Sequence, residues 1–142
     1  MDTDELKARD SVVSAARELD RQGLNRGTSG NVSVRFRDGL LITPSGVPTD
    51  RISPADVVPL NLDGSHPPGQ EPSSEWRFHR DILAHRPEIG AVVHAHPVYC
   101  TAFAICGRSI PAVHYMIAAF GGPTVRCAPY APYGTAELSE VA

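Results

Sequence analysis

The sequence lacks the features that mark a membrane or nucleic-acid-binding protein. No apolar run approaches the ~20 residues that a membrane-spanning helix needs. The first residues, Met1 to Glu5, are acidic, whereas a secretory signal begins with basic and apolar residues. Basic residues are not clustered, and the net charge is −3, which argues against partners with an anionic surface. We therefore expect a cytoplasmic protein that binds neither membrane nor nucleic acid.

Cysteine is scarce and shows no pattern. The three cysteines, Cys100, Cys106 and Cys127, are odd in number and none has Cys-x-x-Cys spacing. This distribution excludes a disulfide framework and a zinc site built from thiolates. We expect reduced, buried thiols without a metal role. Internal repeats and low-complexity tracts are also missing.

The length and composition indicate one globular domain. The chain has 142 residues, 42% of them hydrophobic, and can bury a core of its own. Its 13 prolines and 12 glycines are scattered between patterned segments, which predicts short elements joined by tight turns. We expect a single domain over residues 1–142.

Hydrophobic periodicity and turn signals predict mixed helices and strands. A helix capped by Thr3 is expected over 3–22, with Leu6, Val13, Ala16 and Leu19 buried. The Asp38-Gly39 turn predicts a hairpin of strands at 32–35 and 40–43. The other expected elements are a helical turn at 53–56, an edge strand at 57–62, a helix at 73–86, a strand at 91–96, a helix at 98–106, strands at 110–116 and 124–127, and a helix beginning at Thr135.

The most informative carboxylate is Glu75. It follows Ser73 and Ser74, which can cap a helix, so the sequence places Glu75 in the first helical turn. A glutamate there can act as a general acid or base, or can simply complement the helix dipole. The free N–H groups of the same helix end, with the two hydroxyls, can bind phosphate.

The most informative histidines are His94 and His96. They close an apolar run that is typical of a strand, and residues two apart on a strand share a face. Two imidazoles in that arrangement can bind one divalent ion, although the same pattern also occurs as two half-buried histidines. His79 and His85 have no matching spacing and are expected to be incidental.

Two loops combine glycine with hydroxyl or amide side chains. They cover residues 27–31, with Thr28 and Asn31, and residues 43–46, with Ser45 and Gly46. Backbone N–H groups in such loops can form an anion site. Glycine, serine and asparagine are also what any turn prefers, so plain turn chemistry is the alternative.

Five segments in order resemble the class II (zinc-dependent) sugar-phosphate aldolase family. That family also contains ribulose-phosphate 4-epimerases and the adducin head domain. The segments are residues 23–35 (GLNRGTSGNVSVR), 41–46 (LITPSG), 72–79 (PSSEWRFH), 92–96 (VVHAH) and 110–119 (IPAVHYMIAA).

The resemblance implies a fold, a metal and an assembly. The fold is a three-layer α/β/α domain with a mostly antiparallel central sheet, and the assembly is a homotetramer with sites between subunits. One zinc ion per subunit would be held by His94 and His96, with Glu75 as general acid/base. Tyr115 would donate a proton in a neighbouring subunit's site, and Tyr133 would orient the aldehyde end of the substrate. The residues implied to bind the substrate phosphate are Thr28, Asn31, Ser45, Gly46, Ser73 and Ser74.

The implied activity is aldol cleavage of a short ketose 1-phosphate, such as L-fuculose 1-phosphate, to dihydroxyacetone phosphate and an aldehyde. The alternatives are a ribulose-phosphate 4-epimerase or another lyase of the family, and a non-catalytic interaction domain like the adducin head. The family takes a third zinc-ligand histidine from a strand beyond position 142, so the C-terminal part of the fold is expected to be missing. We therefore expect residues 1–142 to bind zinc weakly and to show little or no aldolase activity, unless a neighbouring carboxylate such as Glu75, or His114, completes the ligand set.

Overall fold

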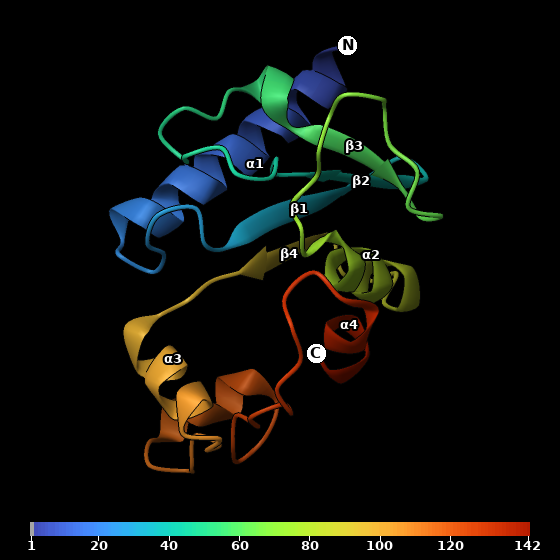
Figure 1. The fold of residues 1–142 in the computed structure, drawn as a ribbon. Helices are drawn as coiled ribbons and strands as arrows, with labels where there is room; N and C mark the ends of the chain where they lie inside the picture. Colours follow the sequence, from blue (N-terminus) through green and yellow to red (C-terminus); the bar gives the residue numbers. More distant parts are fainter. Residues whose placement is uncertain (1) are drawn as a thin grey trace.

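The computed structural model describes residues 2–142 and has three layers (Figure 1). A four-stranded sheet in the order β3-β2-β1-β4, antiparallel throughout, packs against α1 on one face and α2 on the other. The prediction of an α/β/α domain with an antiparallel sheet is thereby confirmed. These elements are α1 (Thr3–Arg21), β1 (Asn31–Phe36), β2 (Gly39–Ile42), β3 (Val58–Asn61), α2 (Trp76–His85) and β4 (Ala91–His94).

The smaller elements lie around this centre. The predicted turn before β3 is the 3₁₀ helix η1, and α4 packs against α2. No helix in residues 2–142 is long and apolar enough to cross a membrane. The remaining bounds are η1 (Pro54–Asp56), α3 (Val98–Ile105), η2 (Tyr115–Phe120) and α4 (Ala136–Val141).

α1 begins at a different cap from the one predicted. The Asp2 carboxylate accepts a hydrogen bond of 2.8 Å from the Glu5 backbone N–H, so Asp2 and not Thr3 is the N-cap residue. Leu6 is 40% exposed, although the sequence places it in the buried stripe. The buried part of the helix starts one turn later, at Arg9, whose guanidinium donates to the Pro54 and Val57 carbonyls.

β2 is buried on both faces and separates two apolar cores. Leu41 packs with Val12 of α1, and Leu40 and Ile42 pack with Leu83 of α2. All four residues of the strand are buried. Because successive side chains of a strand point to opposite faces, this one strand joins the two helical layers.

β1 has one apolar and one polar face, and the polar face is turned inward. Val32 packs in the α1 core. Asn31 and Ser33, 6% and 0% exposed, contact α2. An alternating strand ordinarily turns its polar face to water. Here that face is covered by α2, and it carries part of the site described below.

Arg35 continues the polar face and joins β1 to the end of α2. Its guanidinium donates to the carbonyls of Leu83 (2.6 Å), Arg86 (3.1 Å) and Ile89 (3.0 Å). An arginine is well suited to this place, because the last carbonyls of a helix lack intrahelical donors.

Replacing Arg35 with methionine should destabilise the fold. The variant keeps the aliphatic stem and removes the guanidinium from three carbonyls, although the Arg86 carbonyl keeps the Ile89 N–H as a donor. We therefore expect the free energy of unfolding to fall by about 1.5–3 kcal/mol. Urea unfolding of Arg35→Met measures this loss. Arg51→Met is the matched control, because Arg51 is exposed, and equal losses in the two variants would contradict the assigned role.

The chain after β4 differs most from the prediction. The expected strands at 110–116 and 124–127 reduce to one bridge between Ile110 and Val125, and residues 115–120 form η2. Pro111 and Pro123 explain the difference in part, because proline cannot donate to a strand ladder.

The prediction of buried cysteines is wrong for two of the three. Cys100, within α3, and Cys106, at its C-terminal end, are exposed, and Cys127 is half-buried. None of the residues of α3 is buried, and the helix stands apart from the sheet (Figure 1). An apolar helix here does not imply a core beneath it.

Candidate active site

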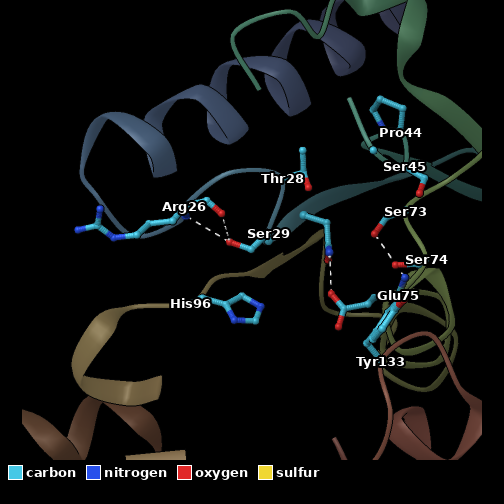
Figure 2. Close-up of a pocket in the computed structure, with 13 residues that line it drawn as sticks. Arg26, Thr28, Ser29, Pro44, Ser45, Ser73, Ser74, Glu75, His96 and Tyr133 are labelled. Atoms are coloured by element: carbon cyan, nitrogen blue, oxygen red, sulfur yellow. Dashed lines mark hydrogen bonds between the residues drawn. The ribbon is translucent and has the colours of Figure 1, made fainter. Parts of the chain in front are cut away.

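A cleft with a volume of about 490 Å³ lies between the loop before β1, the loop after β2 and the start of α2 (Figure 2). Glu75, His96 and Tyr133 line it, and so do all the residues that the sequence analysis associates with phosphate. Those residues are Thr28, Asn31, Ser45, Gly46, Ser73 and Ser74.

Two segments distant in sequence form one wall of this cleft. The Ser45 N–H donates to the Glu71 carbonyl (2.9 Å), and the Ser73 N–H donates to the Thr43 carbonyl (2.9 Å). Between these bonds Pro44 and Pro72 form a bridge. The loop after β2 is therefore held alongside the approach to α2, which brings the two predicted phosphate-binding segments together.

The same pairing moves the start of α2. Because the Ser73 N–H is bonded to Thr43, Ser73 is not helical, and α2 begins at Trp76 with Glu75 at the N-cap position. The prediction of a serine cap with Glu75 inside the first turn is therefore wrong. The buried Ser73 hydroxyl accepts from the Glu75 N–H at 3.4 Å, and Ser74 is exposed.

Arg26 is a cleft residue that the sequence analysis does not identify. Among the residues lining the cleft within 2–142, it is the only arginine or lysine. Its carbonyl accepts from the Ser29 hydroxyl (2.7 Å), which closes the loop on itself. The signal was present in the sequence, as a single cation inside a glycine-rich loop.

The loop before β1 is fixed by a close approach between Gly30 and Asn25. Gly30 has φ +76°, and a Cβ atom there would lie 2.3 Å from the Asn25 side chain. Asn25 is buried, and its side-chain oxygen Oδ1 accepts a hydrogen bond from the His96 backbone N–H (3.0 Å). One side chain therefore fixes both the loop and His96, and no local pattern predicts it.

Glu75, His94 and His96 form a cluster at one end of the cleft. Asn31 and His94 are paired across β1 and β4, so the end of β4 lies beside the start of β1. The ligand atoms of the three cluster residues all lie within 4.8 Å of one another. β4 ends at His94, and His96 lies two residues beyond it, so the prediction that both histidines lie within the strand is wrong. Their rings still converge.

The cluster fits a divalent ion. Glu75 Oε2 lies 3.3 Å from His94 Nε2, and the two histidine Nε2 atoms are 2.8 Å apart. Tetrahedral zinc ligands at about 2.0–2.1 Å from the ion are about 3.3 Å from one another. The two measured separations are close to this value, and Glu75, named in the sequence analysis as a substitute ligand, lies within 4.8 Å of both histidines.

The electrostatics of the cluster favour neutral imidazole. Burial lowers the pKa of His94, the neighbouring His96 acts in the same direction, and the Glu75 carboxylate opposes both. The neutral ring is the form that binds a metal. The contact of 3.3 Å with Glu75 is therefore a polar contact of a neutral ring and not an ion pair.

His79 is not incidental, as the sequence analysis expects, but buried beside the cluster. It is 0% exposed, and its Nδ1 lies 2.8 Å from the Ser33 hydroxyl. The Nε2 of His79 contacts the side-chain oxygen Oδ1 of Asn31, and the side-chain NH₂ group of Asn31 donates to the Glu75 carboxylate (2.8 Å). Because these partners are 44 to 48 residues apart, spacing within one element could not reveal them.

Two predicted aromatic residues differ in their placement. Tyr133, 78% exposed, lines the cleft, and its loop is held by a hydrogen bond of 2.6 Å from Arg77 to the Gly134 carbonyl. Tyr115, in η2, is 80% exposed and does not line the cleft in this chain. Its predicted role in a neighbouring subunit stays a prediction. His114 is not part of the cluster.

Comparison with known sequences places this chain in a family. The sequence model for the class II aldolase and adducin N-terminal domain matches residues 10–142. The chain belongs to the class II aldolase and adducin family. The three-layer fold is therefore that of a class II aldolase domain, and the cluster of Glu75, His94 and His96 is consistent with the metal site of such a domain.

Several relatives of this class II aldolase domain are aldolases. The L-fuculose phosphate aldolase of Escherichia coli (strain K12) is 54% identical over 129 residues, which cover 91% of this chain and 60% of the relative. The 5-methylthioribulose-1-phosphate/5-deoxyribulose-1-phosphate aldolase of Rhodospirillum rubrum is 52% identical over 134 residues, which cover 94% and 61%. The chain thus spans about 60% of the length of these relatives.

A solved structure agrees with the sequence relatives. An L-fuculose 1-phosphate aldolase superposes with a TM-score of 0.89 at 37% identity, covering 100% of this chain and 66% of that chain. The similarity extends over the whole class II aldolase domain, including the segment after β4.

Proposed function

We propose that this protein is a zinc-dependent aldolase that cleaves a short ketose 1-phosphate to dihydroxyacetone phosphate and an aldehyde. The observation that carries this proposal is the cluster of Glu75, His94 and His96 at one end of a polar cleft. A non-catalytic, adducin-like role would not require a carboxylate and two imidazoles to converge. The cleft volume of about 490 Å³ is suited to a small sugar phosphate.

The phosphate group is proposed to bind at the wall formed by the loop after β2 and the approach to α2. Backbone N–H groups and neutral hydroxyls there, with Arg26 nearby, can donate to phosphate oxygens. The residues proposed to take part are Thr28, Asn31, Ser45, Gly46, Ser73 and Ser74. Asn31 donates to Glu75 in this structure, so only one of its two amide protons remains for the ligand.

At the other end of the cleft, one zinc ion per subunit would be held by His94 and His96, with Glu75 completing the set. A bound ion of this kind supplies Lewis-acid stabilisation of negative charge on substrate oxygens. The Glu75 carboxylate is 13% exposed and adjoins the cluster, so it can move a proton on and off the carbon next to the carbonyl. Tyr133 would orient the aldehyde half, and Tyr115 would donate a proton across the subunit boundary of a homotetramer.

The substrate is proposed to be L-fuculose 1-phosphate, and a 5-deoxy- or 5-methylthioribulose 1-phosphate is the second candidate. The observation behind the second candidate is the 52% identity to an aldolase named for those sugars, close to the 54% identity to a fuculose phosphate aldolase. All these substrates share the ketose 1-phosphate end that the proposed phosphate wall and cluster would bind.

A coupled assay tests the proposal and its metal requirement. The zinc-loaded protein is mixed with L-fuculose 1-phosphate or 5-deoxyribulose 1-phosphate, and dihydroxyacetone phosphate is reduced with NADH by an added dehydrogenase. We expect release that a chelator abolishes and zinc restores. No release from either sugar by protein with stoichiometric zinc would overturn the aldolase assignment. Epimerisation of ribulose 5-phosphate in parallel would favour the epimerase instead.

A further inference from the structure

A line of hydrogen bonds connects the buried space between the sheet and α2 with the Glu75 carboxylate. It begins at Ser33 of β1 and passes through His79 of α2 and Asn31 of β1 to Glu75. Ser33 and His79 are both 0% exposed. No buried polar side-chain atom in the described part of the chain lacks a partner, so this line is fully satisfied.

Each hydrogen bond in this line must be donated in the direction of Glu75, from Ser33 to His79, from His79 to Asn31 and from Asn31 to Glu75. An ionised carboxylate only accepts, so Asn31 must present its NH₂ group to Glu75 and its carbonyl oxygen to His79. That oxygen needs an N–H donor, which places the proton of a neutral His79 ring on Nε2. His79 Nδ1 must then accept from the Ser33 hydroxyl.

The neutral ring that this argument needs is consistent with its surroundings. Burial lowers the pKa of His79 to about 3, and the neighbouring His94 acts in the same direction. A neutral imidazole carries one N–H, so its tautomer decides which way the Asn31 amide faces. The opposite tautomer would turn the Asn31 oxygen towards the carboxylate oxygen of Glu75, which is repulsive.

We infer that His79 is a positioning residue: as the Nε2–H tautomer, it orients the Asn31 amide so that this amide holds the Glu75 carboxylate beside His94. The second Asn31 amide proton is left for a ligand in the cleft, which Asn31 lines. The orientation of the Asn31 amide follows from the hydrogen bonds, whereas the expected effect on turnover rests on the proposed function.

Two variants of His79 separate positioning from packing. Glutamine can place an amide N–H near the position of Nε2 and so keep a donor to Asn31, whereas asparagine reaches only towards Ser33. With L-fuculose 1-phosphate or 5-deoxyribulose 1-phosphate, whichever wild type turns over, we expect His79→Asn to lower kcat by roughly 10–100-fold. His79→Gln should recover most of that loss. His85→Gln, at an exposed histidine of the same helix, is the control.

If His79 served only to pack the space between the sheet and α2, kcat and melting temperature would change together in its variants. If the losses in kcat follow the losses in melting temperature, or if His79→Gln is no better than His79→Asn, the inference is overturned. A kcat that falls in His79→Asn and is rescued in His79→Gln at equal melting temperature supports it.

A spectroscopic readout decides the inference even if turnover is never detected. Nitrogen NMR of the histidine-labelled 142-residue chain should show His79 as a single neutral Nε2–H tautomer from pH 5.5 to 8. The Asn31 side-chain amide should be protected from exchange in wild type and His79→Gln, and exposed in His79→Asn. An Nδ1–H or charged His79 would overturn the inference. An absence of turnover beside these expected spectra would instead count only against the proposed function.

Discussion

Glu75→Gln should lower the rate of ketose 1-phosphate cleavage by roughly 10²–10⁴-fold. Glutamine has the same shape as glutamate, and its carbonyl oxygen can still accept the hydrogen bond that Asn31 gives to Glu75. The change removes the negative charge of the side chain and its ability to take up and return a proton. The phosphate wall, held by the bonds between Ser73 and Thr43 and between Ser45 and Glu71, is untouched.

The measurement is kcat in the coupled assay, with zinc content determined for each preparation, because Glu75 also belongs to the metal cluster. The matched control is Glu71→Gln, an exposed carboxylate four residues earlier whose side chain does not line the cleft. It should leave kcat within about twofold of wild type. A Glu75→Gln protein with full zinc and near-normal kcat would assign Glu75 to the helix end alone.

The cluster could be predicted from the sequence because its parts are local signals. The His-x-His pair after an apolar run and a carboxylate after two serines both lie within residues 72–97. Their convergence depended on the pairing of β1 with β4, which no spacing shows. The exact place of Glu75 also depended on a distant contact, because the bond from Ser73 to Thr43 delays the start of α2.

The role of His79 could not be predicted, because β1 departs from a common rule. Alternation of apolar and polar residues in a hairpin strand usually means that the polar face is in water. In this chain the polar face meets α2, so Ser33 and Asn31 need buried partners, and His79 supplies them. The alternation of apolar and polar residues in β1 is visible in the sequence, but the helix that covers each face of the strand is not.

The prediction for the segment after β4 was wrong for a different physical reason. Its apolar runs predict buried elements, yet Tyr99, Ile105 and Phe120 are between 74% and 85% exposed. An apolar segment is expected to be covered, but its hydrophobicity does not identify the part of the structure that covers it. Periodicity therefore identified α3 correctly and misassigned its cysteines to a core.

The pH dependence of stability should show that His79 is buried as a neutral ring. Its pKa is about 3 in the native protein, against an ordinary value of 6.5. Between these values the unfolded chain binds a proton that the native chain does not. The stabilisation is therefore complete above pH 6.5 and is lost as the pH falls towards 3. The expected slope from this residue alone is about 1.4 kcal/mol per pH unit.

His79→Gln isolates this contribution, because glutamine does not titrate. Carboxylates with lowered pKa values, such as Glu18 and Asp56, also weaken the fold in acid, but they are present in both proteins and cancel in the difference. Urea unfolding at several pH values from 7 to 4 should show the variant less stable at pH 7, with the gap to wild type narrowing by about 1.4 kcal/mol per pH unit below 6.5. Parallel curves would mean that His79 keeps its proton equilibrium on folding. A protonated ring could not accept from Ser33, and the line of hydrogen bonds to Glu75 would then have to run differently.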